Sequence, residues 1–304
     1  MKNTDEKLLS EINKLRKEKN AVILAHNYQP GPIQDLADLT GDSLELSRKA
    51  RDTDAEVIVF CGVRFMAETA AILNPGKIVI LPEPDAGCPM ADMITSKDAK
   101  QIKSEFPGVP LVTYVNSNAD VKAESTVCCT SANSIKVVNS FTDAEEVYMA
   151  PDQNLAKYTA KYTKKKIHHW NGYCPVHHNL TEKHVLDAKT KYPDAIFIAH
   201  PECRPEVLDL ADGVFSTSGM IKYVSESEGS LFIIGTEMGL IHTLKKRNPH
   251  KEFVPLHDSL ICPDMKKITL EKILASLEQL RPRITVPENI RKRAELALDR
   301  MLEI

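Results

Sequence analysis

Three cysteine–proline pairs recur at nearly equal intervals along this chain. Cys88, Cys174 and Cys262 each precede a proline, and they lie 86 and 88 residues apart. Apolar, strand-like runs recur with a similar period, and each ends in a polar cluster: AVILAHNYQ (21–29), PLVTYVNSN (110–118) and AIFIAHPEC (195–203). A fixed period of this kind indicates that one supersecondary unit is repeated, so the sequence predicts three related units.

The rest of each repeat alternates between strand-like and helix-like segments. Ser43, Ser131 and Ser218 recur at intervals of 88 and 87 residues, and each is predicted to open an amphipathic helix. A second set of strands is EVIVFCG, EEVYMAP and SLFIIGT; a third set, KIVILPEP, KKIHHWNG and KEFVPLHD, leads to the Cys-Pro pairs. Further helical patterns lie at 5–18, 97–106, 181–191 and 268–280.

Strands that alternate with helices at this spacing predict an α/β fold of three homologous three-layer αβα units, each with a small parallel sheet. The expected units are 1–92, 93–178 and 179–264, and the C-terminal helices in 265–304 are expected to pack on the first. Ligands bind beyond the carboxyl ends of parallel strands, where the polar clusters and the Cys-Pro turns fall. A pseudo-threefold arrangement with these ends inward would bring the three cysteines to one central site.

Composition excludes several functional classes. The chain has 304 residues, 42% of them hydrophobic, so it can bury a substantial core, and its net charge of −3 is spread without a basic face. We therefore expect a small-molecule ligand and neither nucleic acid nor a membrane as partner. No apolar run approaches the roughly 18 residues of a membrane span, and no signal peptide is visible, which favours a cytoplasmic protein. Seven cysteines in such a protein favour metal binding or catalysis over disulfides.

Three convergent cysteines can hold zinc or an iron–sulfur cluster, or they can simply be buried before rigid turns. Structural zinc usually has four ligands in closely spaced pairs such as C-x-x-C, which none of the three cysteines forms. A [4Fe–4S] cluster held by three thiolates leaves one iron free to act as a Lewis acid, and proline also follows a ligand cysteine in ferredoxin motifs. The pattern favours a [4Fe–4S] cluster on Cys88, Cys174 and Cys262, with zinc as the alternative.

A series of motifs in a fixed order resembles quinolinate synthase (the quinolinate synthetase A family) from about residue 20 to about residue 280. It includes HNYQ, DLADLTGDSLELS, DAGCPMADMI, YVNSNADVKAES, VCCTSAN, WNGYCPVH, HPEC, STSGM and CPDMKKITLEK. The resemblance implies an oxygen-sensitive [4Fe–4S] enzyme of NAD biosynthesis, with three αβα domains around the cluster. It implies condensation of iminoaspartate (iminosuccinate) with dihydroxyacetone phosphate to quinolinate, and functional coupling to an aspartate oxidase or dehydrogenase that makes iminoaspartate.

Such a reaction needs proton transfers near neutral pH. His26 and His200 end equivalent strands, and histidine is well suited to proton transfer. Tyr28 and Glu202 lie two residues beyond them, on the same side of an extended chain. We expect Glu202 to move a proton or polarise a hydroxyl, and Tyr28 and Tyr114 to donate hydrogen bonds to an enolate.

Both implied substrates are anions, so the site needs oriented donors. Ser43, Ser131 and the pair Ser216 and Thr217 lie at predicted strand-to-helix turns, where hydroxyls and free backbone N–H groups bind carboxylate or phosphate; an ordinary helix cap is the alternative. Of the pair, the resemblance favours Thr217 as the direct contact. The resemblance gives as expected substrate contacts His26, Ser43, Tyr114, Val115, Asn116, Ser131, His200, Pro201, Glu202, Ser216 and Thr217.

Other candidates are interpreted as structural. His177 and His178 follow Cys174 at a spacing that suggests a local metal motif, but the repeat places the partners of Cys174 elsewhere; His177 is kept only as a nearby or substrate contact. The strand residues His168 and His169 and the strand cysteine Cys61 are assigned to packing. Cys128 and Cys129 are expected to pack at the start of the second unit's helix. Two acids, Glu68 and Glu237, either reach the centre or end their strands. Cys203 follows the HPE motif and could line the site, but it lacks the proline and the repeat position of the other three cysteines.

Two positions depart from the expected family pattern, which leaves their roles open: Arg64 and Asp264. Two rival functions also remain. A zinc-stabilised small-molecule binding protein would use the repeat as scaffold and the cysteines as structural ligands. Another [4Fe–4S] hydro-lyase of the aconitase type would share the open iron but would need only one substrate.

Overall fold

The computed structural model describes residues 2–304, and within them the strands form three parallel four-stranded sheets. Each sheet has the same strand order, in which the first strand of the unit lies second and the last strand lies at an edge. The strands are β1 (Ala21–His26), β2 (Leu39–Gly41), β3 (Val57–Cys61) and β4 (Ile78–Ile80); β5 (Leu111–Tyr114), β6 (Val127–Cys129), β7 (Glu146–Ala150) and β8 (Lys166–His169); β9 (Ile196–Ala199), β10 (Gly213–Val214), β11 (Leu231–Gly235) and β12 (Glu252–Pro255).

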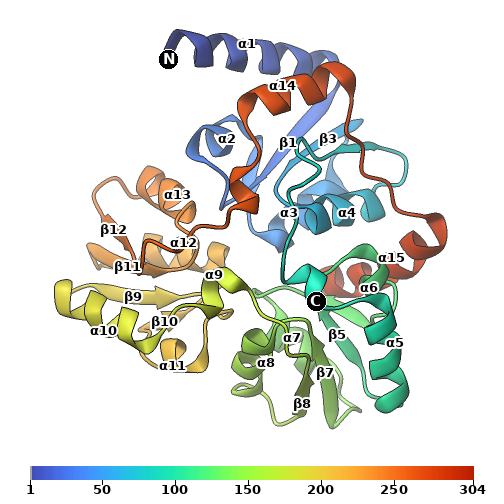
Figure 1. The fold of residues 1–304 in the computed structure, drawn as a ribbon, viewed down its shortest axis with the longest axis vertical. Helices are drawn as coiled ribbons and strands as arrows, with labels where there is room; N and C mark the ends of the chain where they lie inside the picture. The colour runs from blue at the N-terminus through green and yellow to red at the C-terminus, as the bar shows by residue number, and fades with distance from the viewer. Residues whose placement is uncertain (1) are drawn as a thin grey trace.

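Helices cover these sheets, and Figure 1 shows the three units around a common centre. The helices within the units are α2 (Gly31–Leu36), α3 (Ser43–Asp52) and α4 (Arg64–Leu73); α5 (Ser96–Glu105), α6 (Ala119–Lys122), α7 (Ser134–Asn139), α8 (Gln153–Ala160) and α9 (Pro175–His178); α10 (Glu182–Lys191), α11 (Pro205–Leu208), α12 (Thr217–Glu226) and α13 (Leu240–Arg247). The predicted α/β class with three small parallel sheets is confirmed.

The three predicted sets of strands and the four helical patterns are confirmed, but one short strand in each unit was missed. These strands, β2, β6 and β10, have only two or three residues, too few to show a period. Cys128 and Cys129 lie in β6, not at a helix start as expected. Ser43 begins α3 and Ser218 lies in the first turn of α12, whereas Ser131 lies in a turn before α7, so its predicted helix start is wrong.

Each Cys-Pro turn leads into a helix by the same route. Seven residues after each cysteine a threonine accepts a hydrogen bond from a backbone N–H of the following helix, either α5, α10 or α14 (Leu270–Gln279). The residue before each threonine is apolar and at most 1% exposed. A hydroxyl cap preceded by a buried apolar residue fixes the angle at which the chain enters a helix. These threonines and their apolar neighbours are Thr95, Thr181 and Thr269, and Ile94, Leu180 and Ile268.

The terminal helices tie units together. Helix α1 (Lys2–Glu18) packs against α14 at one end of the molecule (Figure 1). Helix α15 (Glu288–Glu303) contacts α4 of the first unit and also β6 and α6 of the second, where Arg293 pairs with Glu124 at 2.7 Å. The C-terminal segment therefore contacts the first unit, and α15 contacts the second unit as well.

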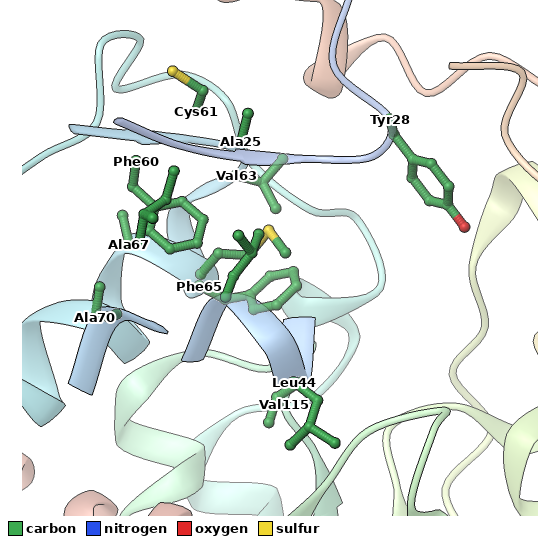
Figure 2. Packing of buried hydrophobic residues seen from close by; sticks show 14 of the residues in the cluster. Ala25, Tyr28, Leu44, Phe60, Cys61, Val63, Phe65, Ala67, Ala70 and Val115 are labelled. Atoms are coloured by element: carbon green, nitrogen blue, oxygen red, sulfur yellow. The ribbon is translucent and has the colours of Figure 1, made fainter. Parts of the chain in front are cut away.

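The largest core cluster surrounds the first sheet and extends into the second and third units. Figure 2 shows Val63, Phe65 and Val115 in this cluster, and Tyr28 at the end of β1 with its ring directed away from them. Among the described residues, no helix is both long and apolar enough to span a bilayer. The boundaries 92, 178 and 264 remain predictions.

Candidate functional site

One cavity gathers residues from all three units at the carboxyl ends of their strands. Its walls contain Cys88, Cys174 and Cys262, which lie far apart in the sequence. The other lining residues are His26, Tyr28, Asp42, Ser43, Val63, Phe65, Met66, Met90, Tyr114, Asn116, Thr130, Ser131, Val176, His177, His200, Glu202, Thr217, Glu237 and Met265. The structure thus brings together most of the residues that the sequence singled out.

The three cysteines suit a metal cluster by position and chemistry. None forms a disulfide, and each side chain faces the same cavity. Burial raises the pKa of Cys88 to about 12 and also raises the pKa values of Cys174 and Cys262. A thiol must lose its proton to bind a metal, so these three stay protonated until a cation displaces the proton.

Carboxylates hold the backbone of the cysteine turns. Asp152 Oδ2 accepts a hydrogen bond from the Cys174 N–H at 3.2 Å, and Glu237 Oε1 accepts one from the Cys262 N–H at 3.2 Å. Both acids lie two residues after the end of the equivalent strands β7 and β11. In the first unit this position is Val63, and no carboxylate can act there.

The turn before Cys88 is held from another unit instead. Asp264 Oδ1 accepts a hydrogen bond from the Gly87 N–H at 3.2 Å, and the same atom lies 2.6 Å from Lys267 Nζ. Asp264 therefore joins the first cysteine turn to the third. Arg64, the other position where the pattern departs, is exposed and pairs with Glu68 at 3.1 Å.

The first and third units form the same turn after their first strands. The Tyr28 N–H donates to His26 Nδ1 at 3.2 Å, and the Glu202 N–H donates to His200 Nδ1 at 3.4 Å. Burial is the main cause that lowers the pKa of both histidines to about 3. Each ring is therefore neutral near pH 7.

A continuous chain of hydrogen bonds crosses the cavity. Tyr28 Oη lies 2.6 Å from Thr236 Oγ1, and Thr236 Oγ1 lies 2.8 Å from His177 Nε2. His177 Nδ1 lies 2.7 Å from Glu202 Oε2, and Tyr114 Oη donates to Glu202 Oε1 at 2.7 Å. One assignment of protons satisfies every contact, with each donor directed toward the Glu202 carboxylate.

Glu202 is the anion at the end of this chain. Burial alone raises its pKa, but His200 and His177 and the hydrogen bonds from His177 and Tyr114 outweigh burial and hold the pKa below its usual range. Burial and the nearby Glu202 raise the pKa of Tyr28 and Tyr114 well above 10, so both phenols stay protonated. The cavity therefore holds the Glu202 carboxylate together with two neutral phenols.

The predicted substrate contacts fall into two groups. Thr217 lines the cavity, whereas Ser216 accepts a hydrogen bond from the Gly219 N–H as the cap of α12. Val115 and Pro201 are buried, and among the described residues they are not part of the cavity wall. All other expected contacts line the cavity: His26, Ser43, Tyr114, Asn116, Ser131, His200, Glu202 and Thr217.

Some residues of the site had no clear signal in the sequence. Thr236 and Asp152 are identified as site residues only by their hydrogen bonds to His177 and to the Cys174 N–H. The sequence kept His177 as a nearby or substrate contact but did not predict its buried, central position. Other candidates lie elsewhere. Of the two acids and the cysteine whose roles the sequence left open, only Glu237 lines the cavity. The candidates that do not line it are His168 and His169 of β8, Cys61, Cys128, Cys129, Cys203 and Glu68.

Comparison with known proteins gives one consistent result. The family model described as quinolinate synthetase A protein matches residues 10–303. A quinolinate synthase from Geobacter sp. (strain M21) is 54% identical over 301 residues, which is 99% of each chain. Quinolinate synthase 1 of Methanosarcina acetivorans is 54% identical over 297 residues, covering 98% of this chain and 97% of its own. A quinolinate synthase of Dehalococcoides mccartyi (strain ATCC BAA-2266 / KCTC 15142 / 195) is 53% identical over 294 residues, with 97% of each chain covered.

Proposed function

The chain belongs to the quinolinate synthase family of enzymes, and from that premise we propose that it condenses iminoaspartate with dihydroxyacetone phosphate in NAD biosynthesis. The products are quinolinate, phosphate and two water molecules, so atoms balance without an oxidant or reductant. One carbon–carbon bond and one carbon–nitrogen bond close the ring. Bond formation, isomerisation and dehydration all require proton transfers, which the cavity must supply.

The observation that carries this proposal is the convergence of three cysteines, one from each unit, on a cavity lined by polar side chains. Cys88, Cys174 and Cys262 would hold a [4Fe–4S] cluster through three of its irons. The cluster would supply a Lewis-acidic iron for a substrate oxygen. A three-thiol set leaves that position free, which a closed four-ligand site would not.

The chain's own residues account for binding the two anions. Hydroxyls of Ser43, Ser131 and Thr217 come from equivalent parts of the three units and enter one cavity. Asn116 joins them, and its Oδ1 is buried without a hydrogen-bond partner among the described residues. Hydroxyl and amide donors of this kind bind carboxylate and phosphate oxygens, and an orphaned buried amide oxygen marks a place for a substrate donor.

Proton transfer is assigned to the series of hydrogen bonds that runs from Tyr28 to Glu202. A phenol proton of Tyr28 can pass to Thr236 while the Thr236 proton passes to His177, because the three groups are in direct contact. His177 in turn stays oriented by Glu202 at 2.7 Å. When Tyr28 gives up its proton, the His177 Nδ1 proton can pass to Glu202, so the single negative charge moves from the carboxylate to the phenolate and no further charge appears in the buried cavity.

The proposal is tested by anaerobic assay of quinolinate formation from the two substrates. We expect Cys88→Ala, Cys174→Ala and Cys262→Ala each to lose the broad absorption near roughly 400 nm that such clusters give, together with turnover. His26→Ala and Glu202→Ala should instead keep that absorption and make less product. Retention of both cluster and turnover in all three cysteine variants would refute the three-cysteine site. A colourless protein with stoichiometric zinc, no air sensitivity and no quinolinate formation would favour the zinc-stabilised binding protein.

A further inference from the structure

Three potential metal ligands of different types meet within the cavity. The ligand atoms of Cys174, His177 and Glu202 all lie within 4.8 Å of one another. His177 Nδ1 is the common neighbour, 3.2 Å from Cys174 Sγ and 2.7 Å from Glu202 Oε2. Ligands of one tetrahedral Zn²⁺ are separated by about 3.3–3.7 Å, given zinc–ligand distances of about 2.0–2.3 Å. Small side-chain rotations are enough to reach that spacing.

The groups behind these ligands are already in place. His177 Nε2 is held by Thr236, Glu202 Oε1 accepts from Tyr114, and the Cys174 N–H donates to Asp152. Metal-binding histidines and carboxylates almost always have such partners on their other polar atoms, and the partners fix tautomer and orientation. The three side chains are therefore oriented for a cation before one arrives.

Charge also suits a divalent cation at this point. A thiolate and a carboxylate together balance Zn²⁺, with His177 as a neutral ligand, so the loaded site adds no net charge to a buried cavity. Three thiolates around Zn²⁺ would leave one negative charge uncompensated, which is costly to bury. All three side chains line the cavity, so a fourth position remains accessible to water.

We propose that, when the chain carries no cluster, Cys174, His177 and Glu202 bind one Zn²⁺ ion. Cys174 is also a proposed cluster ligand, so zinc and the cluster compete for the same thiol. Zinc bound there blocks cluster assembly until it is removed. The inference concerns the cluster-free chain and does not depend on the proposed condensation.

The test is a titration of cluster-free protein with Zn²⁺ against a chromophoric chelator under anaerobic conditions. We expect one bound ion. His177→Ala and Cys174→Ser should abolish this binding. Thr236→Val removes the hydroxyl that both His177 Nε2 and Tyr28 Oη contact, and should weaken zinc binding roughly 10–100-fold through the loss of the His177 partner. Cys88→Ser and Cys262→Ser are the matched controls and should bind zinc as the unaltered chain does.

A second measurement needs no substitution at the site. Co²⁺ bound to the unaltered cluster-free chain should give a sulfur-to-cobalt charge-transfer band with the intensity of one thiolate. The proposal is overturned if the unaltered chain binds no zinc, if the cobalt band has the intensity of three thiolates, or if Cys88→Ser and Cys262→Ser lose the ion as Cys174→Ser does. Quinolinate formation by the cluster-loaded enzyme is unaffected by any of these outcomes, so the two proposals fail separately.

Discussion

At the scale of single residues, the central position of His177 could not be predicted from the repeat. The repeat correctly separated Cys174 from a local Cys-His motif, because its equivalents lie in the other two units. That argument kept His177 only as a nearby or substrate contact, and His177 is 1% exposed and contacts Cys174, Glu202 and Thr236. A repeat identifies what units share, and His177 has no counterpart at Met265 or Ala91, so the period carried no signal for it.

The buried neutral histidines predict a specific pH dependence. Between pH 6.5 and about 3 the unfolded chain binds a proton at His26 that the folded chain does not. The contribution of each such histidine to the free energy of unfolding is therefore complete above pH 6.5. It falls as pH decreases, by up to about 1.4 kcal/mol per pH unit. In urea unfolding of cluster-free protein from pH 7 to 5, His26→Gln should reduce this slope. An unchanged slope would show that His26 is charged in the folded state.

At the scale of elements, two of the three cysteine turns, those of Cys174 and Cys262, donate a backbone hydrogen bond to a carboxylate that follows a strand end. Long apolar strands could be predicted because their composition repeats, whereas β2, β6 and β10 are too short to carry a pattern. The buried carboxylates could not be predicted, because a charged residue after a strand is usually solvated. The role of Asp152 is recognised only in the structure, where its carboxylate accepts a hydrogen bond from the Cys174 N–H.

Asp152→Asn tests the role of these carboxylates. Asp152 uses one oxygen for the Leu155 N–H, at 2.6 Å, and the other for the Cys174 N–H. An amide has a single oxygen, so the variant leaves one buried N–H unpaired, at a cost of about 1–3 kcal/mol. We expect a chelator to remove the cluster from this variant several-fold faster.

Asp42→Asn is the matched control. Asp42 caps α3 and accepts from both the Leu44 N–H and the Glu45 N–H through one oxygen, a pattern that asparagine reproduces. Cluster loss should follow the unaltered rate in this variant. Equal rates for both variants would mean that the Cys174 turn does not depend on Asp152.

At the scale of the whole molecule, the three units are joined by elements outside the repeat. The convergence of the Cys-Pro turns could be predicted because equivalent positions of a threefold repeat face one axis. The position of α15 could not be predicted, because its apolar face indicates that the helix packs on the protein but not against which unit. Contacts to both α4 and β6 arise only in the assembled chain.

Two leucines of α15 test how much this helix contributes. Leu298 is 0% exposed and Leu296 is 59% exposed on the same helix. Leu298→Ala should lower the free energy of unfolding by about 2–5 kcal/mol, through lost burial and the cavity left behind. Leu296→Ala should change it by less than about 0.5 kcal/mol. Urea unfolding measures both, and similar small effects would show that α15 stabilises neither unit.

The Cys-Pro turns also limit how such a site can be encoded. Each unit contributes one cavity-facing thiol and one polar strand end. If the units were separate chains, three of them would have to associate as a trimer to enclose the cavity. In a homotrimer every copy would present the same residues, three times His-x-Tyr or three times His-x-Glu. Joining the copies in one chain removes that restriction. It permits His26 with Tyr28, Tyr114 with Asn116 and His200 with Glu202 around a single centre, so that a threefold frame can present three different pairs of side chains to one cavity.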